Sequence, residues 1–397
     1  MAVAASLFFF SIVASLYAWV GYPALLAFRS RRGTRLYWPR DIEPAVTVII
    51  PVHNRARQIG AKIANTLALD YPRDQLEVLV VSDGSTDGTE SVVEAWPDPR
   101  VRLVTLPASG RLIALQQGGR RARGEILVFT DVNATIDSDA LRHLVRPFAD
   151  GTVGGACGAR KVRRTRSGDS GVLGSVLLAR FEDRLKRLES GLGSVHAGDT
   201  SLCAVRRSLF VPATNPAQAD DIAISARVVL GGRRLVYEPR AVCRRNAETD
   251  STFEFRRRMH MANYSIRALL DLRRDLFNRR GYSWQLISHT IARDIVPVFL
   301  GIALFSSAFL SSASIVFGVI LGVQVIFHTL AYLGWRLRHA RFGRSPVFAI
   351  PFFFVALNGA GLLGLLGVMG GVRPVGAAPR RVKARRNGPI ASDAHAT

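Results

Sequence analysis

Acidic side chains stand at three places where carboxylates could serve a phosphate-bearing substrate. Asp83 follows the apolar run 76–82, Asp131 follows the run 126–130, and Asp220 and Asp221 form an adjacent pair. Buried parallel strands read as continuous apolar runs, and their carboxyl ends open onto the ligand crevice of an α/β sheet. Carboxylates at such ends can hold a nucleotide base and a metal-bound diphosphate. The pattern therefore predicts a nucleotide-using transferase.

The elements that would position these acids alternate between strand and helix. Alternation of this kind predicts right-handed crossovers and a mostly parallel sheet, so the fold class is α/β. The expected strands are 46–51, 76–82, 101–106 and 126–130, and the expected helices are 56–69, 86–95 and 112–123. Further on, the expected elements are helices at 172–188 and 222–230, a strand at 234–239 and a basic helix at 253–280.

Five blocks in this framework resemble a family 2 glycosyltransferase of the GT-A fold. They are Asp83-Gly84-Ser85-Thr86-Asp87-Gly88-Thr89, Pro51-Val52-His53-Asn54, Tyr71-Pro72, Phe129-Thr130-Asp131 and the stretch Ala204–Phe210. The resemblance covers residues 46–264. It implies a GT-A catalytic domain, Rossmann-like with a mostly parallel sheet, and a nucleotide-sugar donor.

The resemblance implies a nucleotide-sugar site made of Pro51, Asn54, Asp83, Arg111 and Asp131. In it, Asp83 would accept a hydrogen bond from the uracil ring of a UDP-sugar, and Arg111 would reach the phosphates. The alternative is that Asp83 and Asp87 cap a turn and a helix start.

Asp131 and Asn133 occupy the place of the family's DxD motif and are the expected metal ligands. A divalent metal, Mg²⁺ or Mn²⁺, would neutralise the diphosphate, and hard oxygen ligands suit both ions. The chain departs from the motif because Asn133 replaces the second Asp, and an amide contributes no charge. The alternative is a capped loop after a buried strand.

The acidic pair resembles the family's catalytic acids before a helix. Inversion at the anomeric carbon needs a base for the acceptor hydroxyl, and one of two neighbouring carboxylates can have a raised pKa. Asp221 is the expected base and Asp220 its support, although both would also suit a helix N-terminus. Asp199 is a candidate acceptor contact, with a plain turn as the alternative.

A motif of polymer-building relatives, QxxRW, is replaced here by Arg257-Arg258-Met259-His260-Met261. This departure puts processive synthesis in doubt. His260 and Arg256–Arg258 could still contact the diphosphate. Alternatively, the basic helix at 253–280 could lie on anionic lipid. The histidines at 53, 143 and 196 and the three cysteines form no recognisable ligand set.

The composition is strongly basic, with 53 Lys+Arg against 30 Asp+Glu and a formal net charge of +23. Such an excess indicates an anionic partner, and the apolar spans favour anionic membrane lipid over nucleic acid. Cys157, Cys203 and Cys243 have no paired spacing, which fits reduced thiols in a cytosolic domain.

Long apolar stretches predict a membrane protein with several passes. Residues 1–28 carry no charge and are followed by arginines, which is typical of an anchor with its C-terminal flank in the cytoplasm. Residues 295–335 suit two helices joined near 311–314, and a third block runs over 347–371. Four crossings would put the basic tail outside, so either the last block is a re-entrant hairpin or the positive-inside rule is broken.

The expected domains are therefore a transmembrane helix at 1–28, a GT-A domain at 45–250 and basic amphipathic interfacial helices at 251–293. A transmembrane region at 294–371 and a basic, disordered tail at 372–397 complete the chain.

These observations predict a multi-pass inner-membrane enzyme with a cytoplasmic catalytic domain. It would transfer a sugar, with inversion, from a UDP-sugar to a lipid-linked or growing glycan acceptor in cell-envelope polysaccharide synthesis. The alternatives are a processive polysaccharide synthase of the same family and a non-catalytic nucleotide-sugar-binding subunit of a membrane glycan assembly.

Overall fold

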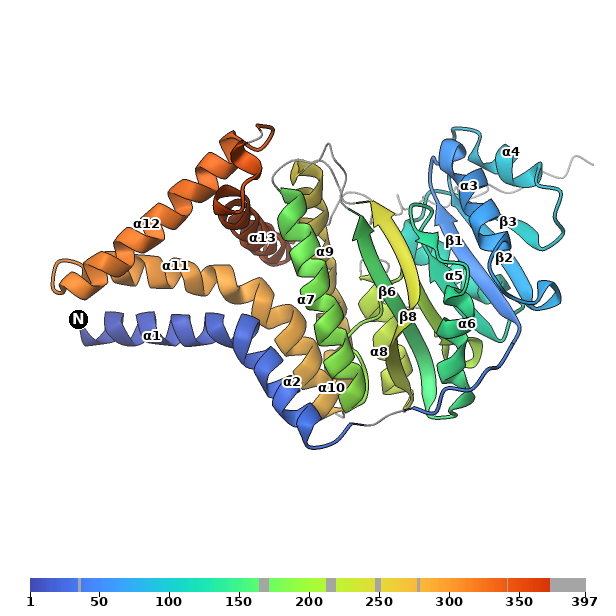
Figure 1. The fold of residues 1–397 in the computed structure, drawn as a ribbon, viewed down its shortest axis with the longest axis horizontal. Helices are drawn as coiled ribbons and strands as arrows, with labels where there is room; N and C mark the ends of the chain where they lie inside the picture. The colour runs from blue at the N-terminus through green and yellow to red at the C-terminus, as the bar shows by residue number, and fades with distance from the viewer. Residues whose placement is uncertain are drawn as a thin grey trace, which may run out of the picture.

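The chain folds into a sheet domain and a group of long helices that project from it (Figure 1). The computed structural model describes residues 1–34, 37–163, 171–211, 219–246, 251–276, 279–340 and 342–371. The predicted tail at 372–397 lies outside the described residues.

The sheet domain contains an eight-stranded mixed sheet in the order β3-β2-β1-β4-β7-β6-β8-β5. Its first half is parallel, as the alternating pattern predicted, because β1 pairs in parallel with β2 and β4, and β2 with β3. In the second half β7 runs antiparallel to both β4 and β6. The strands are Val46–Val52 (β1), Leu76–Asp83 (β2), Val101–Leu106 (β3), Ile126–Thr130 (β4), Thr135–Ile136 (β5), Val153–Arg163 (β6), Leu202–Arg206 (β7) and Arg234–Asn246 (β8).

Both faces of the sheet are buried, which explains why the central strands read as continuous apolar runs. Alternate residues of β1 enter different cores: Val48 and Ile50 pack on one face, and Ile49 packs on the other. The first face is covered by α3 (Ala56–Leu67), α4 (Thr89–Glu94) and α6 (Ala140–Val145), and the second by α5 (Arg111–Arg121) and α8 (Asp220–Leu230).

Within the described residues, four helices are long and apolar enough to cross a membrane: Ala2–Arg31, Gly281–Leu310, Ile315–Arg336 and Pro346–Met369. The first consists of α1 (Ala2–Leu16), a π-helical turn η1 (Tyr17–Gly21) and α2 (Tyr22–Arg31). The second consists of α10 (Arg280–Leu286), a π-helical turn η5 (Ile287–Ile291) and α11 (Ala292–Leu310). The others are α12 (Ile315–Arg336) and α13 (Pro346–Met369), so the predicted joint at 311–314 is confirmed.

Two helices connect the sheet domain to this group: α7 (Gly171–Leu192) and α9 (Ser251–Leu276). The prediction of interfacial helices over 251–293 differs from the structure, because the second apolar helix begins at Gly281. One part of α9 enters the sheet core through Leu269 and Leu272, and Asn263 Nδ2 donates to the Gly364 carbonyl of α13 at 3.2 Å. Hence α9 is packed between the sheet domain and α13.

Candidate active site

The loops after β1 and β2 are tied together by side-chain caps. Asn54 has a positive φ of 53°, and its Oδ1 accepts a hydrogen bond from the Thr86 amide at 2.8 Å. The Asp87 carboxylate accepts from the Ala56 amide at 3.0 Å and the Thr89 amide at 3.1 Å. Asp87 therefore caps the starts of both α3 and α4. The helix predicted at 86–95 begins later than expected, at Thr89.

Asp83 ends β2 and faces the turn before α5. Its Oδ1 accepts from the Ser109 amide at 2.6 Å, and its Oδ2 accepts from the Gly110 amide at 2.9 Å. Gly110 has a φ of 95°, a left-handed conformation that glycine adopts easily. These bonds fix the Asp83 carboxylate and leave lone pairs for a further donor.

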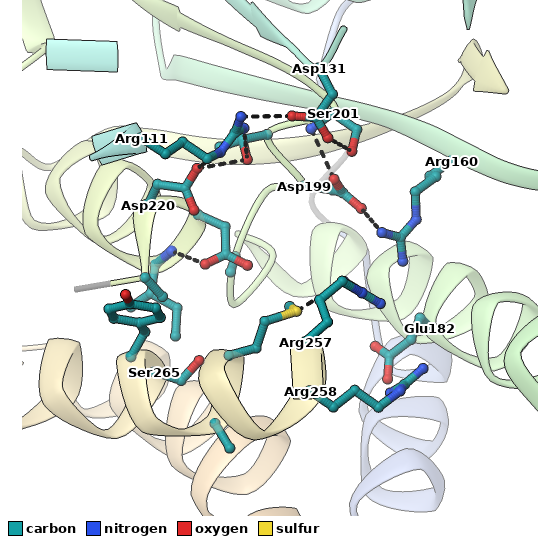
Figure 2. Close-up of a pocket in the computed structure, with 18 of the residues that line it drawn as sticks. Arg111, Asp131, Arg160, Glu182, Asp199, Ser201, Asp220, Arg257, Arg258 and Ser265 are labelled. Carbon is teal, nitrogen blue, oxygen red and sulfur yellow. Dashed lines mark hydrogen bonds and ion pairs between the residues drawn. The ribbon is translucent and has the colours of Figure 1, made fainter. Parts of the chain in front are cut away.

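Arg111, the first residue of α5, links two of the predicted acidic positions. Its Nη1 lies 2.8 Å from Asp131 Oδ1, and its Nε donates to Asp220 Oδ2 at 2.7 Å (Figure 2). Burial lowers the pKa of the guanidinium, but Asp131 and Asp220 outweigh it and hold that pKa above its usual value. The arginine therefore bridges the two carboxylates and holds them close together.

Asp131 lies at the carboxyl end of β4, where Ser201 also donates to its Oδ2 at 3.0 Å. Asn133 follows on the same loop and is exposed. The loop is held from behind by Lys62, whose buried Nζ donates to Thr130 Oγ1 at 2.9 Å and to the Ala134 carbonyl. One carboxylate and one amide on the loop offer hard oxygen ligands of the kind that a divalent ion takes.

Asp220 and Asp221 occupy the first turn of α8. Burial, together with repulsion from the neighbouring Asp220, raises the pKa of the Asp221 carboxyl to about 7. A carboxyl with this pKa can accept a proton near neutral pH. The two adjacent acids thus have different surroundings, because Asp220 is paired with Arg111.

Asp199 lies between the acids and the helices. Its Oδ2 is 3.1 Å from Arg160 Nη1, and its Oδ1 accepts from the Ser201 amide at 2.9 Å. Burial raises the pKa of Asp199, but Arg160 and Lys186 hold it well below its usual range. Asp199 is therefore an ionised, fixed wall residue.

These side chains surround a cavity of about 830 Å³. Eight of the nine predicted site residues line it, namely Pro51, Asp83, Arg111, Asp131, Asn133, Asp199, Asp220 and Asp221. The ninth, Asn54, lies outside the lining residues and acts through the loop that it ties. On α9, Arg257 and Arg258 line the cavity and pair with Glu254, whereas Arg256 and His260 are not among the lining residues.

Sequence reasoning missed a buried ionic cluster on the far side of the cavity. Glu189 Oε2 lies 2.9 Å from His196 Nδ1, and Glu189 Oε1 lies 2.8 Å from His289 Nδ1. His289 Nε2 is 2.7 Å from Glu182, which also pairs with Arg293. No spacing in the sequence signals this cluster, because it joins two segments, 182–196 and 289–293, and Glu189 and His289 are 100 positions apart.

The expectation that the histidines form no ligand set is corrected here for His196. Glu189, His196 and His289 bring three possible ligand atoms within 4.8 Å of one another, all buried. These atoms already bond to one another, and the Tyr22 hydroxyl donates to Glu189 Oε1 at 2.5 Å. The donor chemistry suits a metal, but Glu189 is already bonded to both histidines and to Tyr22.

The sheet domain is similar to known proteins. Residues 47–210 match the family model "Glycosyl transferase family 2". The chain is 26% identical over 204 residues to the poly-beta-1,6-N-acetyl-D-glucosamine synthase of Staphylococcus aureus strain COL, covering 50% of this chain and 49% of that protein. It is 24% identical over 245 residues to the synthase of the same name from Staphylococcus epidermidis, covering 60% and 59%. The chain thus spans about half the length of the curated relatives that it matches.

A solved structure resembles almost the whole chain. It is the mannosyltransferase PcManGT from Pyrobaculum calidifontis, in complex with GDP-Man and Mn²⁺. The TM-score is 0.68 at 24% identity, and the match covers 91% of this chain and 99% of that one. The likeness shows the fold, which is GT-A with accompanying helices, as the sequence predicted.

Proposed function

We propose that the chain is a membrane-bound inverting glycosyltransferase, because residues 47–210 match the model of glycosyl transferase family 2. It moves a sugar from a UDP-sugar to a membrane-associated acceptor, lipid-linked or a growing glycan, in cell-envelope polysaccharide synthesis. The relatives named as polysaccharide synthases support this class of reaction.

The observation that carries the proposal is the Asp221 carboxyl. This group lies beside the Arg111–Asp220 pair, and its pKa is about 7. In this proposal Asp221 takes the proton of the acceptor hydroxyl as that oxygen attacks the anomeric carbon. The bond to the diphosphate breaks on the opposite face, and inversion follows. Asp220 supports Asp221 from its ion pair with Arg111.

The donor side uses the strand ends. Asp83 accepts from the base through the lone pairs that its turn leaves free, and Pro51 and Asn54 shape the loop beneath it. Arg111 lies where its guanidinium can also meet the diphosphate oxygens. Asp199 forms the acceptor side of the cavity, fixed by Arg160.

A divalent cation fits the Asp131–Asn133 loop, since a carboxylate and an amide oxygen are hard ligands. When bound there, Mg²⁺ or Mn²⁺ would neutralise the diphosphate as it leaves. The solved relative in complex with Mn²⁺ and GDP-Man supports a metal, and it puts GDP-sugars beside UDP-sugars as donors to be tested.

The test measures nucleotide release by the detergent-purified protein from a panel of UDP- and GDP-sugars, with membrane lipid extract as acceptor. We expect turnover with Mn²⁺, its loss with chelator, and a fall of at least about 100-fold for Asp221→Asn. The matched control is Asp74→Asn, an exposed acid outside the cavity. Donor binding without turnover would instead support the non-catalytic nucleotide-sugar-binding subunit.

Product length separates single addition from processive synthesis. The replacement of QxxRW by Arg257–Met261 favours single additions, and the named relatives favour a polymer. A ladder of products from one acceptor would establish the processive alternative.

A further inference from the structure

The cavity continues beyond the strand ends to the place where the apolar helices meet the domain. We call this part the membrane-side lobe, and define it by Trp19, Glu182, Arg258, Arg293, Asp294 and Asn358. Glu182 and Arg258 lie across the cavity from Asp131 and Asp220 (Figure 2). One continuous cavity therefore joins the acidic site to the base of the apolar helices.

Two π-helical turns lie side by side at this lobe. The Tyr17 hydroxyl of η1 is 2.8 Å from Ser288 Oγ of η5, and Trp284 Nε1 donates to the same hydroxyl at 3.0 Å. The first turn supplies Trp19 to the lining, and the second supplies His289. Single π-turns inside α-helices are rare and often mark functional sites.

The lobe contains buried donors that the described part of the chain leaves without an acceptor. They are Trp19 Nε1 and two guanidinium nitrogens of Arg293, Nε and Nη2. Buried polar groups almost always have a partner, so three such donors on two adjacent side chains require an explanation. The Arg293 guanidinium lies 4.9 Å from the Trp19 ring centroid, which places the donors together.

Although Arg293 belongs to an apolar helix, the lobe places two guanidinium groups, those of Arg258 and Arg293, beside the carboxyl groups of Glu182 and Asp294. Arg293 and Asp294 are the only Lys, Arg, Asp or Glu residues between 281 and 310. Glu182 is already paired with Arg293 and His289, and Arg258 Nε lies 2.7 Å from Glu254. Asp294 faces α13, where a Cβ added at Gly361 would lie 3.5 Å from its Oδ1. Ionisable groups in apolar helices usually face a partner or a ligand path.

We propose that the membrane-side lobe binds the phosphoryl group of a lipid-linked acceptor, with Arg293 and Trp19 as its donors and Arg258 adding positive charge. The inference rests on the proposed function and names its acceptor class. A phosphoryl group offers several strong acceptor oxygens and a negative charge, which matches a set of unpartnered donors around a guanidinium. The lipid chain would leave along the apolar helices, and the rest of the acceptor would extend toward Asp221.

The test is a direct binding measurement on the full chain in detergent, without nucleotide-sugar. The probes are geranylgeranyl phosphate, geranylgeraniol and inorganic phosphate. We expect the lipid phosphate to bind at least about tenfold more tightly than either of the other two, since a charge-assisted hydrogen bond contributes more than 1 kcal/mol. Because transfer is not measured, the result is independent of whether a donor is turned over.

Two variants probe the donors. Arg293→Gln should weaken binding of the lipid phosphate by about tenfold or more, and Trp19→Phe by about threefold, because Phe keeps the ring but loses the N–H. The matched control is Arg338→Gln, an arginine that also lies over a tryptophan, Trp335, but outside the cavity. If the loss of the Glu182 pair prevents Arg293→Gln from folding, the Trp19→Phe result decides.

Equal binding of the phosphate and the alcohol would overturn the proposal, as would unchanged binding in Trp19→Phe or equal loss in Arg338→Gln. Inorganic phosphate that binds as tightly as the lipid would overturn the lipid-linked assignment and leave a free-phosphate site. If the lipid phosphate binds but no sugar is transferred from any donor, the proposed function is refuted. The assignment of a lipid phosphate to the membrane-side lobe is then still supported.

Discussion

At the scale of single residues, Asp221 and Asp220 show how adjacent identical side chains acquire different properties. Asp220 accepts from Arg111 at 2.7 Å, whereas Asp221 accepts from the Ile222 amide at 2.8 Å. Burial of Asp221 and repulsion from the adjacent Asp220 carboxyl raise the pKa of Asp221. The difference depends on an arginine more than one hundred residues away in sequence.

We expect this raised pKa to appear in the pH dependence of transfer. The base must be ionised to take a proton, so kcat/KM should be constant above about pH 7 and fall about tenfold per pH unit below it. The measurement is nucleotide release between pH 5 and 9, with donor binding measured at each pH as the control. A profile that bends near pH 4, the usual range of an aspartate, would contradict the assignment.

At the scale of elements, α2 is attached to the catalytic domain through a buried contact on α7. The Tyr22 hydroxyl donates to Glu189, and both side chains are fully buried. Burial raises the pKa of Glu189, but His196 and His289 outweigh it and hold that pKa well below its usual range. The carboxylate is thus a charged acceptor shared by α2, α7 and η5.

The substitution Tyr22→Phe should therefore destabilise the folded protein by about 1–3 kcal/mol, since a buried hydrogen bond to a charged group is lost. The measurement is the thermal unfolding midpoint in detergent. Tyr332→Phe is the control, because Tyr332 is 57% exposed on α12. Identical midpoints for the two variants would mean that the Tyr22 bond contributes no stability.

At the scale of the whole molecule, the placement of α13 bears on the number of membrane crossings. Four crossings, one for each apolar span, would put the basic tail outside, against the positive-inside rule. Residues 346–369 form one helix, so the hairpin alternative is not seen in the described chain. This helix packs along α9, and Asn263 reaches its Gly364 carbonyl. The N-terminus and the α11–α12 connection, in contrast, lie together at the end far from the sheet domain (Figure 1).

We therefore predict three crossings, with α13 on the catalytic side of the membrane. The basic tail then lies on the same side as the catalytic domain, in agreement with the positive-inside rule. An impermeant maleimide applied to spheroplasts should label Ser312→Cys, and should label Asp74→Cys and Ser392→Cys only after permeabilisation. The three native cysteines are buried and free, so they give little background. Labelling of Ser392→Cys in intact spheroplasts would establish a fourth crossing.

The sequence by itself determined the local parts of this protein. Continuous apolar runs predicted the parallel strands because both faces of the sheet are buried, and acids after those runs predicted where the site residues lie. Asp83 and Asp131 line the same cavity, as strand-end positions in one sheet should, and the acidic pair lines it from the first turn of α8. The family resemblance followed from the order of these local blocks.

Only the tertiary structure decided which distant side chains form ion pairs and hydrogen bonds with one another. The Arg111 bridge, the Lys62 support and the Glu189 cluster each join residues separated by dozens to more than one hundred positions. Packing against α13 likewise gave a predicted surface helix a buried face, which includes Asn263. Periodicity reports one element at a time, whereas ion pairs and cavities depend on how elements meet, which no local pattern encodes.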